Sequence, residues 1–207
     1  MKQKYSSYKL LALSSALSAL SLTAAAQNAN VVYQDSNVRF TLVTDGTVRM
    51  EYAPDGKFLD NKSFIAVNRS YPEVKYKKNE TSKKVVISTD YLTLSYTKGS
   101  GPLTERNLSI VSAKTKKKAA DGKQLIPFAW HPGQKDAPDA NLKGTYRTLD
   151  GYDGDSRGDT GKMPIEDGLL SRSGWTLIDD SEGYIFDNSD WQWVEHRPNE
   201  GKTQEMY

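Results

Sequence analysis

The sequence predicts an all-β protein, an antiparallel β-sandwich with little helix beyond an N-terminal targeting segment. Apolar and polar residues alternate with a period of two in several short segments, which is the pattern of half-buried strands. Turn-forming stretches rich in Gly, Pro, Asn and Lys separate these segments, and no stretch has the length and periodicity of a long helix. Many short strands with turn residues between them favour packed antiparallel sheets.

The clearest strand pair is a hairpin over residues 38–52. Positions 38, 40 and 42 are apolar and positions 39 and 41 polar, and the alternation resumes at 48, 50 and 52. A two-residue turn would set Leu42 opposite Arg49, whereas a three-residue loop over 44–46 sets it opposite Val48. We therefore predict the three-residue loop, with Gly46 in the left-handed conformation that its last position requires.

Other segments carry weaker strand signals. Further strands are predicted at Phe64–Val67, Val74–Tyr76, Val85–Thr89, Tyr91–Tyr96, Leu108–Val111, Trp175–Ile178 and Trp191–Val194. The final residues, Glu205–Tyr207, are not predicted to form a strand or helix that closes the domain.

A secretory signal peptide is predicted over residues 1–26, which leaves residues 27–207 as one mature domain. A basic region precedes an apolar run from Leu10 to Leu22, which is too short to cross a bilayer. Small residues at Ala24 and Ala26 fit the cleavage requirement, and cleavage is expected after Ala26. We therefore expect an exported protein, periplasmic or extracellular, without membrane contact after signal cleavage.

The composition argues against several classes of function. The formal charge of the whole chain is +2, but loss of the three signal lysines leaves 25 basic residues against 26 acidic ones. No nucleic-acid partner is therefore expected. The chain has no Cys, which excludes thiol catalysis and thiolate metal sites.

The sequence shows no assembled catalytic apparatus. The Gly-x-Ser-x-Gly motif of serine hydrolases is absent, and His131 and His196 are the only histidines. Neither histidine has a metal-ligand partner at a suitable spacing. We therefore predict no catalytic residue, no metal site and no cofactor.

A long irregular stretch rich in Gly, Asp and Pro follows Pro127 and is where function is expected. It contains an acidic loop over residues 150–159, whose carboxylates and tyrosine could bind sugar hydroxyls and cover a sugar face. A plain series of Asp-Gly turns is the alternative. The spacing excludes an EF-hand, because Arg157 and Pro164 occupy ligand positions, and leaves an irregular calcium site as a further alternative.

Two separated motifs carry a resemblance to a known family. They are Asn141–Gly151, with the sequence NLKGTYRTLDG, and Gly168–Ser181, with the sequence GLLSRSGWTLIDDS. In order and spacing they resemble the N-terminal domain of glycoside hydrolase family 31. In that family a galactose-mutarotase-like β-sandwich precedes a (β/α)8 barrel, and two barrel aspartates catalyse retaining hydrolysis of α-glycosides.

The resemblance implies a non-catalytic domain of an exported α-glycosidase of the α-glucosidase or α-xylosidase type. Its partners would be its own catalytic barrel and an α-linked oligosaccharide. A loop of the family's sandwich reaches over the barrel mouth, which implies substrate-binding roles for Asp150, Tyr152 and Asp153. The sequence ends where the barrel would begin, so the chain alone is expected to be inactive and to expose the apolar surface that the barrel would cover.

Two other functions remain open at this stage. A free-standing carbohydrate-binding module would present exposed aromatic residues as a strip on one sheet face. An aldose mutarotase would need a His and a Glu that converge in a concave sheet. Glu195 and His196 are adjacent, so on a strand they would point to opposite faces, which argues against the mutarotase.

Overall fold

The computed structural model describes residues 30–113, 127–137, 139–143, 167–199 and 201–207. Within these ranges every regular element is a β-strand and all strand pairing is antiparallel, which confirms the predicted fold class. The described residues also contain no helix that is long and apolar enough to span a membrane. The predicted signal peptide lies outside these ranges.

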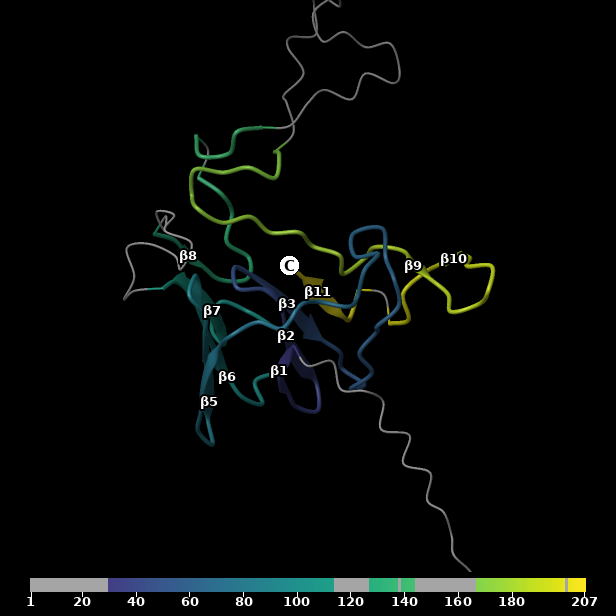
Figure 1. The fold of residues 1–207 in the computed structure, drawn as a ribbon, viewed down its shortest axis with the longest axis horizontal. Helices are drawn as coiled ribbons and strands as arrows, with labels where there is room; N and C mark the ends of the chain where they lie inside the picture. The colour runs from purple at the N-terminus through teal and green to yellow at the C-terminus, as the bar shows by residue number, and fades with distance from the viewer. Residues whose placement is uncertain (1–29, 114–126, 138, 144–166, 200) are drawn as a thin grey trace, which may run out of the picture.

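The strands form two larger sheets and one small one (Figure 1). The four-stranded sheet has the order β1 (Val31–Gln34), β2 (Val38–Thr44), β3 (Thr47–Tyr52) and β11 (Gln204–Met206). The five-stranded sheet has the order β4 (Lys77–Glu80), β5 (Lys84–Ser88), β6 (Leu92–Thr97), β7 (Leu108–Ser112) and β8 (Ala129–Trp130). The small sheet pairs β10 (Val194–Glu195) with β9 (Ile185–Phe186).

The hydrophobic core lies between the two larger sheets. Tyr33 and Phe40 of the four-stranded sheet and Tyr96 of the five-stranded sheet form an aromatic cluster with ring centroids 5.3–5.8 Å apart. Each of these side chains is at most 4% exposed. Burying aromatic and aliphatic groups from both sheets is the main favourable term that holds them face to face.

The predicted hairpin has the expected pairing but a different turn. Leu42 lies opposite Val48, as predicted, and the register shifts between Leu42 and Thr44. Thr44 itself pairs with Thr47, so the loop shortens to Asp45 and Gly46, and the extra residue forms an irregularity within β2. The left-handed conformation predicted for Gly46 is wrong, because Gly46 does not have a positive φ.

The other strand predictions had mixed outcomes. Those at 85–89, 91–96 and 108–111 are confirmed by β5, β6 and β7. Those at 64–67, 74–76 and 175–178 are wrong, and only Val194 of 191–194 lies in a strand. Phe64, Ile65 and Val67 are 50–61% exposed, so their apolar character does not reflect burial in a sheet.

The end of the chain also corrects a prediction. Residues 204–206 form β11, which pairs with β3 at the edge of the four-stranded sheet, with Glu205 opposite Glu51. Tyr207 and Ile178 exchange two backbone hydrogen bonds of 2.9 and 3.0 Å. The last residues therefore close this sheet and tie the segment around Ile178 to it.

Candidate functional site

The three predicted substrate-binding residues, Asp150, Tyr152 and Asp153, lie outside the described residues. The structure does describe the two segments from which the chain enters and leaves their region. These segments, residues 140–143 and 167–172, are called the neck below.

The neck is a short antiparallel ladder. Asn141 forms a bridge with Ser171, and its side chain both donates to and accepts from the backbone of Gly168 over 2.9 Å. An ion pair of 2.5 Å joins Lys143 to Asp167. Residues 143 and 167, at the ends of the two described segments, are therefore close together.

The outer side of the neck combines apolar and charged groups. Leu142, Leu169 and Leu170 are 50%, 63% and 70% exposed. Beside them, Ser173 donates a 2.5 Å hydrogen bond to Asp136, and hydrogen bonds from Ser171 and Ser173 lower the pKa of the Asp136 carboxyl. These residues could therefore contact a partner. Among the described residues of this region, no buried group is placed for catalysis.

A second exposed region surrounds the small sheet. Val194 lies opposite Phe186, the Phe186 ring packs on Phe64 with centroids 5.1 Å apart, and Tyr184 packs on His196 at 4.8 Å. Because residues two apart on a strand, and residues opposite each other on paired strands, share a face, these side chains form one strip. We call these five residues the aromatic strip.

The aromatic strip is open to solvent. Phe64, Tyr184 and Val194 are 61%, 45% and 49% exposed, and Trp191 and Trp193 at the nearby turn are 78% and 67% exposed. The small sheet lies to the side of the four-stranded sheet, away from the five-stranded sheet (Figure 1). Exposed apolar surface of this kind marks sites of interaction.

Buried ion pairs fix this exposed region to the sandwich. Arg197 follows the strip and donates to Glu205 of β11 over 2.5 Å, to Asp180 over 2.8 Å and to the carbonyl of Gly183 over 2.8 Å. Arg197 is 6% exposed and Asp180 1% exposed. Charge-assisted hydrogen bonds at this depth hold the segment on a rigid base.

The ion pairs continue across the outer face of the four-stranded sheet. Arg39 makes a bidentate contact with Glu51 at 2.6 and 2.8 Å, and Arg49 contacts Glu205 at 2.9 Å. Asp60 covers this face and accepts from Arg39 at 2.7 Å. Sequence reasoning placed Arg39 on a polar, half-buried face, whereas the residue is 7% exposed.

The electrostatics of this network indicate a structural role. Burial alone would raise the pKa of the Glu205 carboxyl, but the charges of Arg49, Arg69 and Arg197 overcome that effect and lower the pKa to about 2. Glu205 is therefore a fixed anion enclosed by guanidinium groups and has no proton to transfer near neutral pH. Cross-strand pairing of opposite charges at positions 39 and 51 was the sequence signal that could have revealed the network.

The histidines are not arranged for acid-base chemistry. His131 Nδ1 contacts the carbonyl of Pro132 at 3.0 Å, and His196 packs on Tyr184. Glu195 lies opposite Ile185, on the other face of the hairpin from His196. The described part of the chain also holds no group of three His, Asp or Glu residues that could bind a metal.

Trp175 has a different role from the two exposed tryptophans. It is half-buried and packs against the core, with its ring centroid 6.4 Å from that of Trp130.

No protein-family model matches this sequence, and no curated protein matches it significantly. Function is therefore inferred from the residues and geometry of the chain itself.

Proposed function

We propose that this chain is the non-catalytic N-terminal sandwich domain of an exported retaining α-glycosidase. It packs on a catalytic barrel and lends the loop that contains Asp150, Tyr152 and Asp153 to substrate recognition. The two motifs at 141–151 and 168–181 suggest the family. The observation that carries the packing role is the exposed aromatic strip with Trp191 and Trp193, held on a rigid base of buried ion pairs.

The neck supports the role proposed for the loop. Its paired segments give the loop a fixed point of departure, and residues that bind substrate need such a scaffold. The acidic and aromatic residues between 150 and 153 would then accept hydrogen bonds from sugar hydroxyls and cover an apolar sugar face. The catalytic carboxylates of a retaining enzyme, about 5–5.5 Å apart, would come from the barrel.

The first test is translation of the coding DNA downstream of Tyr207, followed by expression of the mature chain with and without that extension. The isolated chain should not hydrolyse nitrophenyl α-glucoside or α-xyloside, and the extended protein should hydrolyse one of them with retention of configuration. An extension without a barrel, or an isolated chain with full activity, contradicts the proposal.

A second test addresses the loop in the extended enzyme. Replacing Asp150 and Asp153 by Asn should raise KM by about tenfold with a smaller change in kcat, because these groups would bind substrate without taking part in bond cleavage. Asp159→Asn, also in the acidic loop but outside the predicted contacts, serves as the matched control. Equal effects of all three changes would remove the specific role of Asp150 and Asp153.

A carbohydrate-binding module is the second candidate, and the aromatic strip is the observation that favours it. Aromatic faces such as that of Tyr184 could cover pyranose rings directly. Affinity electrophoresis of the mature chain in gels with soluble α-glucan distinguishes the two functions. Retardation that Tyr184→Ala abolishes favours the module, whereas unretarded migration favours the docking role.

A further inference from the structure

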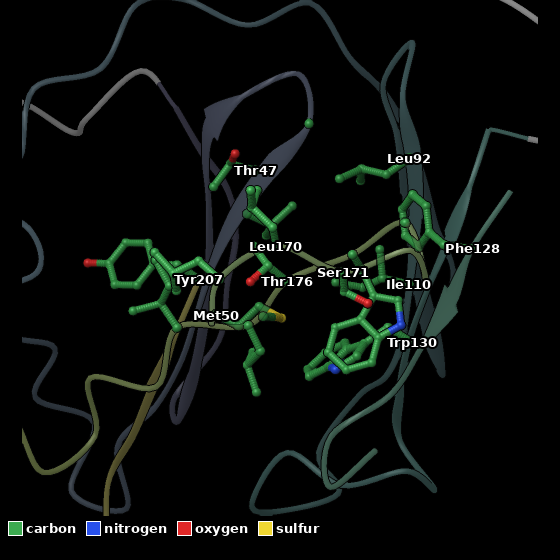
Figure 2. A pocket seen from close by; sticks show the side chains of 17 residues that line it. Thr47, Met50, Leu92, Ile110, Phe128, Trp130, Leu170, Ser171, Thr176 and Tyr207 are labelled. Atoms are coloured by element: carbon green, nitrogen blue, oxygen red, sulfur yellow. The ribbon is translucent and has the colours of Figure 1, made fainter. Parts of the chain in front are cut away.

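A cavity of about 490 Å³ opens at one edge of the sandwich, between the two larger sheets (Figure 2). Met50 of β3 and Tyr207 form one wall, and Ile110 of β7 and Trp130 of β8 form the facing wall. The segment from Leu169 to Ile178 crosses between them. This volume lies in the range of cavities that hold small organic ligands.

The lining defines which ligands the cavity could accept. Among the described side chains that line it, none carries a formal charge, and most are aliphatic or aromatic. The polar side-chain groups are the hydroxyls of Thr47, Ser171, Thr176 and Tyr207 and the indole N–H groups of Trp130 and Trp175. An ion would lose its hydration here without a counter-charge, and a sugar would leave most of its hydroxyls unpaired.

Trp130 supplies a polar group that needs a partner. Its side chain lines the cavity at 4% exposure, and its Nε1 is buried without a hydrogen-bond acceptor among the described residues. A buried donor without an acceptor is unfavourable and uncommon in folded proteins. An acceptor on a bound molecule would satisfy it.

The cavity is accessible from outside. Leu169 and Leu170 at its rim are 63% and 70% exposed. Thr176, also on the lining, is exposed as well. A small molecule could therefore enter without separation of the two sheets.

We propose that this cavity binds an uncharged, largely apolar molecule, such as a fused-ring aromatic compound, that carries a hydrogen-bond acceptor for Trp130 Nε1. The apolar walls supply most of the affinity by burying the ligand, and the buried Trp130 donor orients it. The proposal does not depend on the sugar contacts proposed for Asp150, Tyr152 and Asp153.

Titration of the mature chain with prodan, a neutral fluorescent naphthyl ketone, tests the proposal. Binding should be saturable, with a blue-shifted emission. Thr176→Trp should fill the cavity from an exposed position and weaken binding at least about tenfold, while Thr104→Trp, an exposed control away from the cavity, leaves it unchanged. No saturable binding, or equal binding by both variants, overturns the proposal.

The role of the donor is tested by Trp130→Phe, which keeps an aromatic ring but removes the N–H. The variant should bind prodan about fivefold to tenfold more weakly. It should bind ethylnaphthalene, which has no ketone, within about twofold of the parent affinity, as measured by displacement of bound prodan. Equal losses for both ligands would show that Nε1 makes no hydrogen bond to them.

Discussion

Arg49 Nε donates a 2.9 Å hydrogen bond to Glu205 Oε1, although the two residues are 156 positions apart in the chain. The contact joins β3 to β11 on the face of the four-stranded sheet that points away from the core. Both side chains are at most 5% exposed, so water cannot replace either partner. The pair lies at the centre of the network that carries the aromatic strip.

Replacing Glu205 by Gln should destabilise the fold strongly. The change leaves the buried guanidinium groups of Arg49 and Arg197 with one anion fewer, and breaking a buried pair in this way typically costs about 3–5 kcal/mol. Urea unfolding of the mature chain at pH 7 measures the loss. Glu182→Gln, at an exposed position, should change the free energy of unfolding by less than about 0.5 kcal/mol. Equal effects of both changes would contradict the structural role of Glu205.

The contribution of Glu205 should also depend on pH. Its pKa is lowered to about 2 in the folded state from the ordinary value of 4.5, so the folded chain holds this proton less tightly than the unfolded chain. The stabilisation is therefore complete above about pH 4.5, amounts to about 3 kcal/mol, and is lost as pH falls towards 2. The stability difference between the parent and Glu205→Gln should narrow over this window. A difference that is constant from pH 6 to about pH 2.5 would contradict the assignment.

Gly183→Ala should disturb the ion pair between Asp180 and Arg197. A Cβ at Gly183 would lie 2.1 Å from Asp180 Oδ1, so the carboxylate would have to move from its buried position. Overpacking of this kind costs about 1–3 kcal/mol. Gly46→Ala is the control, because its Cβ would have no neighbour closer than 3.9 Å and its backbone is not left-handed. Thermal unfolding should separate the two variants clearly.

The exposed tryptophans should make the isolated chain self-associate. Trp191 and Trp193 are 78% and 67% exposed beside the aromatic strip. Replacing both by Ser should shift the sedimentation profile towards the monomer, while Tyr76→Ser, a 41% exposed residue before β4, should not. A parent chain that sediments as a monomer at high concentration would argue against a docking surface here.

Local sequence pattern predicted the parts of the fold that depend on local burial. The alternation in β2 and β3 gave the correct pairing of Leu42 with Val48, because a slip by one residue would expose the core face. It missed β4, whose four residues are all exposed and mostly charged. Such an edge strand carries no hydrophobic pattern, and its lysines protect the sheet edge from further pairing.

The candidate site was harder to predict, because it depends on contacts between distant parts of the chain. From the sequence, Arg39 and Arg49 look like ordinary residues of a polar strand face. In the fold they form hydrogen bonds with Asp60 and Glu205, which are distant in the chain. Trp191 and Trp193 were predicted to lie in a strand, whereas they lie in an exposed turn before β10. Asp150, Tyr152 and Asp153 remain a prediction from the resemblance.

Hydrogen exchange tests the docking role of the aromatic strip most directly. Amides of residues 184–196 should exchange at least about tenfold more slowly in the protein that includes the downstream barrel than in the mature chain alone, while β5 and β6 should exchange equally in both. Protection confined to residues 184–196 and the neck is the result that the docking role predicts. Unchanged exchange at residues 184–196 and in the neck would contradict the docking role.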